Sequence, residues 1–371
     1  MKKAIIQTID NISEISNISQ YDFIVSVLTS WQFDVALAYL RSHRLNNGVL
    51  IVETVPFSDV VRYRLSEEQV LKYEGLFSGI YFCQNRKQPY QIGNLIKCLF
   101  SRDKKKPMYW LRPLPRISLR LLSNIVTSQR EIHYVALDEG LTSYMPYIDT
   151  LKILYPNTFK VYSIWFVQKA LNAISSLYIK EQEEFGLFHS VHSQLEPNKE
   201  ACAALEQVYK ERVQSKKETK ECILFFKDYL VIPDEQAIRI FDAILEGIKD
   251  SGVNIIIKKH PSDTDCSFDD VLLSKYPNIR IINSVISGEE LVATYEPELI
   301  VGGFSTVVIS SSFIYSIPTI SFSGIYLQDR IVSPLHEKQI KLFMNQLDDY
   351  IPFCRSTSEV CEKIEKNIIT K

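Results

Sequence analysis

Short apolar runs alternate with amphipathic stretches along the first half of the chain. Runs typical of buried strands occupy residues 23–27, 49–53, 80–82, 108–111 and 133–137. Between them, apolar residues recur at helical spacing over residues 33–43, 67–76, 92–100 and 117–127. This alternation predicts a mostly parallel sheet with helices on both faces.

The second half repeats the same alternation. Apolar runs occupy residues 222–226, 254–258, 279–282, 299–301 and 319–322. An amphipathic helix is predicted over residues 234–249, with Gly252 as its stop signal, and a last helix over residues 357–369. The sequence therefore predicts a second α/β domain of the same kind.

A charged stretch, residues 206–221, separates the two halves and has little apolar content. We therefore predict an N-terminal domain over residues 1–205, a linker over 206–221, a C-terminal domain over 222–355 and a closing helix over 356–371. The expected fold class is α/β, with two Rossmann-like domains facing each other across a cleft. Ligands of such sheets bind beyond the carboxyl ends of the strands, so we expect the active site there.

Composition narrows the class of function. The 371 residues include 42 basic and 44 acidic ones, for a net charge of −2, so the basic excess typical of nucleic-acid binders is missing. The seven cysteines are odd in number and form no CxxC pair, which argues against a disulfide framework or a structural zinc site. Reduced thiols in a cytoplasm are the better match.

Two apolar segments are candidates for a targeting or membrane signal, and polar residues interrupt both. Near the N-terminus, Gln7, Asp10 and Asn11 end the apolar run too early for a signal peptide. No segment reaches the uninterrupted apolar length of a spanning helix, and the nearest to it, residues 161–178, contains Gln168, Lys169 and Asn172. It predicts a buried or interfacial helix and not one that spans a membrane.

The first candidate for chemistry is Asp138-Glu139-Gly140, directly after the strand predicted at residues 133–137. Two adjacent carboxylates at the carboxyl end of a strand can supply a general base, because like charge and partial burial raise one pKa. Gly140 permits a tight turn. The alternative is an ordinary turn whose acids cap a helix that begins near Thr142.

The second candidate is Lys258-Lys259-His260-Pro261, at the end of the strand predicted at residues 254–258. Pro261 restricts the backbone of His260 to extended geometry. An imidazole presented there can bind a phosphate oxygen or protonate a leaving group, and the lysines add positive potential. The alternative is a histidine in a charged surface turn.

The third candidate is Gly302-Gly303-Phe304-Ser305-Thr306, after the strand predicted at residues 299–301. A glycine-rich turn followed by hydroxyl groups at a helix start can hold a phosphate, because backbone N–H groups and the positive helix end attract anions. The alternative is a plain turn in which Ser305 caps the helix. The glycine spacing matches neither a dinucleotide fingerprint nor a P-loop.

Two further segments have a functional and a structural interpretation, and the structural one is favoured for both. Asp263-Thr264-Asp265 has the form of a DxD metal motif, but its position in a polar loop after His260-Pro261 favours a solvated turn, so no metal ligand is predicted. The basic and aromatic residues 104–120 could contact anionic lipid or an acidic glycan, although a solvated loop and helix face is favoured.

In their order, Asp138-Glu139-Gly140, His260-Pro261 and Ser305-Thr306 resemble the signature of bacterial sialyltransferases. That group has a D/E-D/E-G motif in the first domain, and an HP motif and a Ser/Thr pair in the second. The resemblance spans about residues 23–322 and is closest to the lipooligosaccharide sialyltransferases, glycosyltransferase family 52. Residues 28–32 resemble that family's Thr-Pro-Leu-Gln turn, from which Trp31 departs.

The resemblance implies a GT-B fold, CMP-sialic acid as donor, inversion at the anomeric carbon, and neither a metal nor another cofactor. An acid of Asp138-Glu139 would be the base, and His260 would contact or protonate the CMP phosphate. Ser305 and Thr306 would bind this phosphate. The remaining residues expected around it are Lys258, Lys259, Pro261 and Gly303. Some members are proposed to have the base early in the second domain, where Asp228 and Asp234 are candidates.

The predicted function is therefore an inverting sialyltransferase acting on a galactose-type glycan in lipooligosaccharide, O-antigen or capsule synthesis. Its expected partners are the nucleotide sugar and the glycan, with no nucleic acid. We expect a cytoplasmic protein; peripheral contact with the inner membrane and a homodimer are further options. The alternatives are another GT-B transferase, for glucose or Kdo, and a non-catalytic glycan-binding scaffold of a capsule assembly complex.

Overall fold

The computed structural model describes most of the chain as two compact units, Met1–His192 and Ser193–Lys371. The described residues are 4–9, 14–15, 20–53, 65, 67–83, 108–113, 132–155, 157–175, 179–191, 194–213, 221–229, 231–260, 263, 265–284 and 286–369. The helices predicted at residues 92–100 and 117–127 lie outside these ranges.

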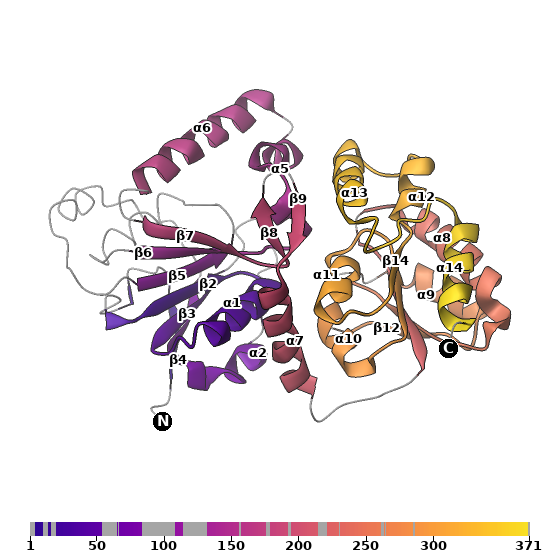
Figure 1. Cartoon of the computed structure of the whole chain (residues 1–371), viewed down its shortest axis with the longest axis horizontal. Coiled ribbons are helices and arrows are strands. Elements are labelled where there is room, and N and C mark those ends of the chain that lie inside the picture. The colour runs from indigo at the N-terminus through magenta and orange to yellow at the C-terminus, as the bar shows by residue number, and fades with distance from the viewer. Residues whose placement is uncertain are drawn as a thin grey trace. The chain divides into compact units, whose positions relative to one another are not determined.

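The first unit is built on a parallel sheet with strand order β1-β4-β3-β2-β5-β6-β7 (Figure 1). Its strands are β1 (Ile5–Ile9), β2 (Phe23–Val27), β3 (Gly48–Glu53), β4 (Phe77–Cys83), β5 (Met108–Pro113), β6 (Ile132–Leu137) and β7 (Ile179–Phe185), and β8 (Phe188–Val191) follows them. Its helices are α1 (Ser30–Ser42), α2 (Glu67–Leu71), η3 (Glu74–Leu76), η4 (Leu141–Tyr144), α5 (Tyr147–Leu154) and α6 (Thr158–Ser175). The central strands β2 and β3 are buried along their whole length, which explains their unbroken apolar sequences.

The second unit contains a parallel sheet with strand order β12-β11-β10-β13-β14. The strands of this sheet are β10 (Cys222–Phe226), β11 (Asn254–Lys258), β12 (Arg280–Ile282), β13 (Leu299–Gly302) and β14 (Thr319–Ser321). The unit also contains strand β9 (Gln194–Pro197), which lies outside this sheet. Its helices are α7 (Lys199–Val213), α8 (Asp234–Ile248), η5 (Lys249–Ser251), α9 (Ser267–Lys275), α10 (Gly288–Tyr295), α11 (Thr306–Ile314), α12 (Ser323–Gln328), α13 (Pro334–Leu347) and α14 (Thr357–Ile369).

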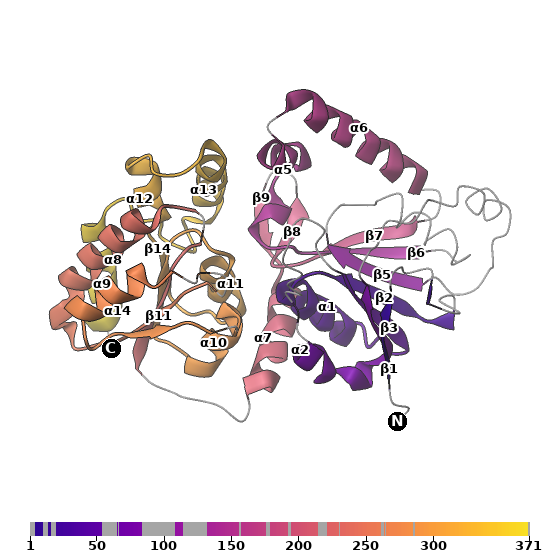
Figure 2. The same ribbon diagram turned by 180° about the vertical axis from the view of Figure 1, so that it is seen from behind.

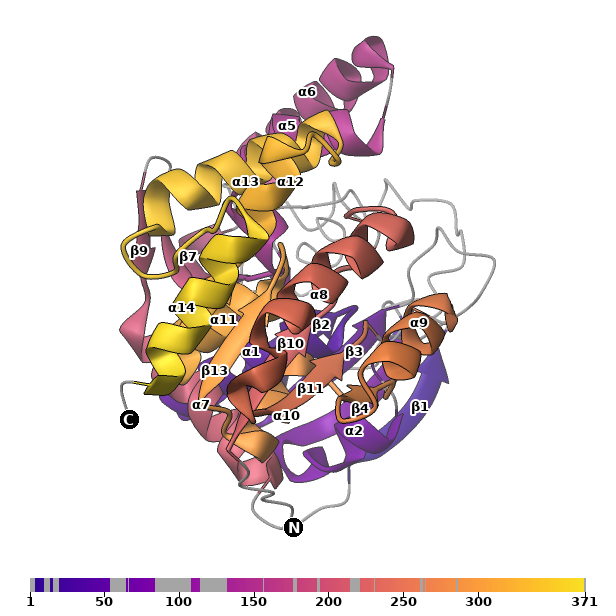
Figure 3. The ribbon, with the colours of Figure 1, turned by 90° about the vertical axis from the view of Figure 1, so that its right-hand side faces the viewer.

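Helices cover both faces of the second sheet. Figures 2 and 3 show α8, α9 and α14 over one face, and α10 and α11 over the other. The amphipathic helix α8 buries Ile240, Phe241, Ile244 and other apolar side chains, and Gly252 follows it in the left-handed conformation, with φ of 69°. Two doubly wound α/β units confirm the predicted fold class.

The boundary between the units differs from the predicted one. Residues 206–213 belong to α7, whose buried Leu205, Val208 and Tyr209 lie on the face that packs against α10 and α11. Of the described charged residues in this stretch, Lys210 is exposed and forms an ion pair with Glu206, whereas Arg212 is partly buried beside Glu290 of α10. The structure therefore places the division at His192, not at residue 205, and residues 214–220 lie outside the description.

Residues 161–175 of the apolar stretch belong to α6, and residues 176–178 lie outside the description. Within the described residues, no helix has the length and apolar character needed to cross a membrane.

Candidate active site

Three strand ends meet at one edge of the second sheet. Strand β10 lies between β11 and β13, and Phe226 pairs in register with both Lys258 and Gly302. The chain crosses over in opposite directions on the two sides of β10, which makes this edge the switch point where ligands of such sheets bind. The segments that leave this edge are residues 227–229, 259–260 and 303–305.

His260 is exposed at this edge, and its ring stacks on Tyr229. The two ring centroids are 4.9 Å apart and the planes differ by 6°. Tyr229 follows β10 as His260 follows β11, so adjacent strands position the two rings. The stack restrains the imidazole while its exposure leaves it accessible to a ligand.

Lys258 is buried, with 3% of its surface exposed. Its ammonium group donates to the carbonyl oxygens of Lys259, at 2.5 Å, and Ser284, at 2.8 Å. Burial lowers the pKa of Lys258 to about 8, because removal from water disfavours its charged form. A phosphate beside this group would supply the negative charge that stabilises its protonated form.

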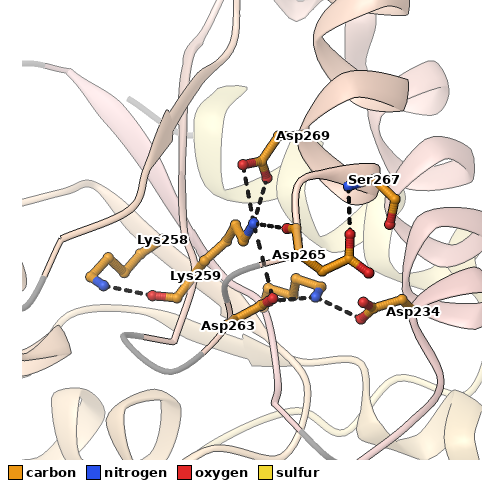
Figure 4. A network of polar contacts seen from close by, with 8 residues as sticks. Asp234, Lys258, Lys259, Asp263, Asp265, Ser267 and Asp269 are labelled. Atoms are coloured by element: carbon orange, nitrogen blue, oxygen red, sulfur yellow. Dashed lines mark hydrogen bonds and ion pairs between the residues drawn. The ribbon is translucent and has the colours of Figure 1, made fainter.

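Lys259 extends to the opposite side of the strand and is held by acidic partners (Figure 4). Its ammonium group is fully buried, lies 3.0 Å from the Asp269 carboxylate and donates to the carbonyl of Asp265. These contacts attach α9 and the loop before it to β11. Of the two adjacent lysines expected at the phosphate, Lys259 is thus engaged in the packing of its own unit.

Asp263, the first acid of the DxD sequence, is also buried and paired. Its Oδ2 accepts a 2.5 Å hydrogen bond from Lys227, which also donates to Asp234 at 2.7 Å. The two acids raise the pKa of Lys227 against the opposing effect of burial. Asp265 is exposed and accepts from the backbone of Ser267. Among the described residues, no cluster of histidine, cysteine and acidic side chains has the arrangement of a metal site.

Asp228 connects two of the segments at this edge. Its Oδ2 accepts hydrogen bonds from the backbone N–H of Phe304 and the hydroxyl of Tyr326, both at 2.7 Å. Gly303 allows this approach, because a Cβ there would lie 2.0 Å from Asp228 Oδ2. Burial raises the pKa of the Asp228 carboxyl to about 6. Asp228 thus holds the turn that leads into α11.

Ser305 and Thr306 lie at the start of α11, where the turn ends. Ser305 has extended backbone angles and its side chain makes no capping hydrogen bond, while Thr306 is the first residue of the helix. Both side chains are partly exposed. The first N–H groups of a helix lack partners within it, so this arrangement can accept an anion. Pro261 lies outside the described residues.

The two acids of the motif in the first unit, Asp138 and Glu139, lie in different environments. Asp138 is 1% exposed, and its carboxylate accepts from the Tyr144 hydroxyl and the backbone N–H groups of Gly140 and Leu187. Burial raises its pKa, and these hydrogen bonds oppose the rise. Glu139 is half-buried, and its backbone N–H donates to Ser143 at 2.6 Å.

The turn after β6 explains the glycine of this motif. Gly140 has φ of 99°, a conformation that favours glycine, and its carbonyl accepts from the N–H of Ser143. The 3₁₀-helix Leu141–Tyr144 then places the Tyr144 hydroxyl on Asp138. The expected tight turn is therefore present. Asp138 is buried in it, and Glu139 is partly exposed.

Residues 28–32 form the start of α1. Thr29 and Gln32 make a capping box, in which each side chain accepts a hydrogen bond from the backbone N–H of the other residue. Gln32 also accepts from the N–H of Leu28 at 2.7 Å. Both side chains thus stabilise the helix start.

Sequence reasoning missed Lys227, Tyr229 and Tyr326 as members of the second unit's site. A signal for the first two was available, because they follow the buried strand β10 as His260 follows β11. Tyr326 gives no comparable signal, since it reaches Asp228 from a helix far along the sequence.

Comparison with solved structures finds chains of distant sequence. A sialyltransferase from Photobacterium damsela is 12% identical, covers 90% of this chain and 81% of its own, and has a TM-score of 0.43. UDP-GlcNAc 2-epimerase from Neisseria meningitidis is 10% identical, with coverages of 99% and 100% and a TM-score of 0.47. The E. coli heptosyltransferase WaaC is 11% identical, with coverages of 93% and 99% and a TM-score of 0.46. These similarities assign neither a substrate nor residue roles.

No curated protein matches the sequence. A family model, in contrast, matches residues 23–323, which include the candidate residues of both units. Its description is alpha-2,8-polysialyltransferase, which confirms the prediction of a sialyltransferase family, whereas the finer resemblance to lipooligosaccharide sialyltransferases stays a prediction. Because the match covers most of the chain, the protein belongs to the alpha-2,8-polysialyltransferase family and is a glycosyltransferase.

Proposed function

We propose that the protein transfers sialic acid from CMP-sialic acid to a hydroxyl group of a glycan. The description of the family favours an acceptor that itself ends in sialic acid over the galactose-type acceptor expected from the sequence. The observation that carries the proposal is the switch-point edge of the second sheet. There, exposed His260, buried Lys258 and the start of α11 provide groups suited to one phosphate.

The proposed reaction is a single displacement. The acceptor oxygen forms a bond to the anomeric carbon as the bond between that carbon and the phosphate oxygen breaks. CMP leaves with the electron pair of the broken bond, and a base takes the proton of the acceptor hydroxyl. His260 protonates or binds the phosphate, and Lys258 and the N–H groups of α11 stabilise its charge.

We place the base in Asp138-Glu139 and favour Glu139. Its side chain is partly exposed, whereas the Asp138 carboxylate is buried and accepts three hydrogen bonds. Asp228 is the alternative base, because burial raises its pKa to about 6, a value suited to proton transfer near neutral pH.

A melting-temperature series with CMP, CDP, UDP and GDP tests the donor. A ligand at 100 times its Kd stabilises the folded state by about 2.7 kcal/mol. We expect the largest shift with CMP, and a reduced shift in His260→Ala but not in the control His336→Ala. His336 lies on α13, where its ring contacts the Ser333 cap. A larger shift with UDP would instead support a glucosyltransferase.

Catalysis is tested with CMP-sialic acid and an oligosialic acid acceptor. We expect chain extension and CMP release by the wild type, and a loss of about 10²–10⁴-fold in His260→Ala. A protein that binds glycan but neither extends it nor hydrolyses the donor at high concentration would be the non-catalytic scaffold.

A further inference from the structure

Helix α6 presents an aromatic face to solvent. Phe159 is 82% exposed, Phe166 71%, Val167 52% and Tyr162 49%. The opposite side of the helix carries Val161, 1% exposed, and Gln168, 9% exposed, and α6 packs on α5 of the same unit. Burial of only one side is the arrangement of a helix whose other face is available to a partner.

The exposed face has an apolar centre with a lysine on each side. At 3.6 residues per turn, Phe159 and Phe166 lie nearly in line, and Lys160 and Lys169 flank them on opposite sides. The ammonium group of Lys169 lies 4.4 Å from the Trp165 ring centre, and that of Lys160 lies 4.5 Å from the ring centre of Tyr155. The sequence of α6 contains neither Asp nor Glu.

This combination identifies the chemistry of the partner. Aromatic side chains are stabilised at the boundary between lipid headgroups and acyl chains, and flanking lysines reach the lipid phosphates above this boundary. A helix with two cations and no acid attracts an anionic surface. Figures 1 and 2 show α6 at the periphery of its unit, with α5 near one end.

We propose that the exposed face of α6, formed by Phe159, Tyr162, Phe166 and Val167 with Lys160 and Lys169, binds the protein peripherally to an anionic lipid surface. The helix lies in the plane of the surface with the two phenylalanines inserted below the phosphates. This interaction is independent of the proposed donor and uses a segment distinct from the basic stretch at residues 104–120.

Co-sedimentation of the full chain with lipid vesicles tests the proposal. We expect the wild type to bind vesicles of equal parts phosphatidylcholine and phosphatidylglycerol more tightly than pure phosphatidylcholine, with binding weakened by salt. Phe159→Ser/Phe166→Ser should lower the partition coefficient roughly tenfold or more. Lys160→Gln/Lys169→Gln should lower it roughly fivefold for each lysine, on anionic vesicles only.

The matched control is Val271→Ser/Leu273→Ser on α9, which removes two other apolar side chains, 45% and 42% exposed. It should bind vesicles as the wild type does. Melting temperatures identify any variant that has lost its fold. If the phenylalanine variant is unfolded, the Lys160→Gln/Lys169→Gln variant tests the proposal in its place.

Three results would overturn the proposal. The wild type could stay in the supernatant with anionic vesicles, or the phenylalanine variant could sediment as the wild type does. Alternatively, gel filtration could show a wild-type dimer that the phenylalanine variant converts to a monomer, without vesicle binding by either. The face of α6 would then be covered by a second copy of the chain.

Discussion

The Tyr326 hydroxyl donates a 2.7 Å hydrogen bond to Oδ2 of Asp228, although 98 positions separate the two residues in the sequence. The other carboxylate oxygen of Asp228 is buried without a hydrogen-bond partner. Burial of the carboxyl group raises its pKa to about 6, because removal from water disfavours the charged form more than the hydrogen bonds to Tyr326 and Phe304 favour it.

The first prediction concerns the pH dependence of stability in Asp228→Asn. Between pH 3.8 and about 6, native Asp228 keeps its proton while the unfolded chain has released it. The wild type therefore loses stability as pH rises through this window, and the asparagine variant lacks this loss. We expect the melting temperature of the variant, relative to wild type, to be higher at pH 7 than at pH 4. The full effect is on the order of 3 kcal/mol. A difference that stays constant with pH would show that Asp228 is not protonated in this range.

The second prediction concerns Gly303→Ala. A Cβ at this position would lie 2.0 Å from both Asp228 Oδ2 and the Tyr326 hydroxyl, so the turn must shift. We expect a loss of about 1–3 kcal/mol in stability together with weaker CMP binding, because the turn leads to Ser305. Calorimetry and a CMP titration measure the two effects.

Gly252→Ala is the control for this prediction. Gly252 has φ of 69°, and no atom lies within 4 Å of an added Cβ. Alanine there should lower stability by roughly 1 kcal/mol through backbone strain alone and leave CMP binding unchanged. Equal CMP affinity in Gly303→Ala and wild type would contradict a ligand role for the turn.

The parts of the fold that sequence predicted well are the strands buried on both faces. The predictions at residues 222–226 and 254–258 coincide with β10 and β11, because two covered faces require an unbroken apolar run. Strand β7 was missed. It lies at the end of the first sheet and has the sequence IKEQEEF, in which only Ile179 and Phe185 are apolar.

The candidate site also has a part that the sequence predicts and a part that it does not. The positions of His260 and Ser305 beyond the ends of β11 and β13 could be predicted, because both residues follow apolar strands and strand ends can be located from sequence. The different roles of Lys258 and Lys259 could not be separated, since adjacent residues of a strand point to opposite faces and their partners lie elsewhere. Only the folded chain shows that Asp269 holds Lys259.

The third prediction concerns proton uptake by Lys258. Its pKa of about 8 means that much of the ammonium group is neutral above pH 8. A bound phosphate favours the charged form and should raise this pKa, so CMP binding takes up protons above pH 8 and weakens as pH rises further. Titration calorimetry in buffers of different ionisation enthalpy measures this uptake. We expect Lys258→Met to lose it and Lys249→Met, on the surface, to keep it. Wild-type binding without proton uptake would place Lys258 away from the phosphate.

The fourth prediction concerns chelation. The Asp263 carboxylate is 2.5 Å from the Lys227 ammonium group, so this buried acid is already paired with a positive charge. We therefore expect activity to persist in EDTA and to be unchanged in Asp265→Asn. As a control, divalent cations, including magnesium and manganese, are added back separately after chelation. Loss of turnover in EDTA with recovery in manganese would mean that this ion pair opens to admit a metal.

The last prediction separates the candidate bases. Asp138→Asn replaces a carboxylate that accepts three hydrogen bonds, and its amide nitrogen would face one of the donors, so stability should fall by about 1–3 kcal/mol. Glu139→Gln preserves shape, and we expect an unchanged melting temperature and a loss of about 10²–10⁴-fold in kcat with CMP affinity retained. The residual activity of Glu139→Gln should also lose the acidic limb of the wild-type pH–rate profile. If Glu139→Gln keeps near-normal kcat while Asp228→Asn is folded, binds CMP and is inactive, then Asp228 is the base. In that case the Asp138-Glu139-Gly140 turn has only a structural role, because its buried carboxylate holds Tyr144 and the backbone of Leu187 without taking part in proton transfer.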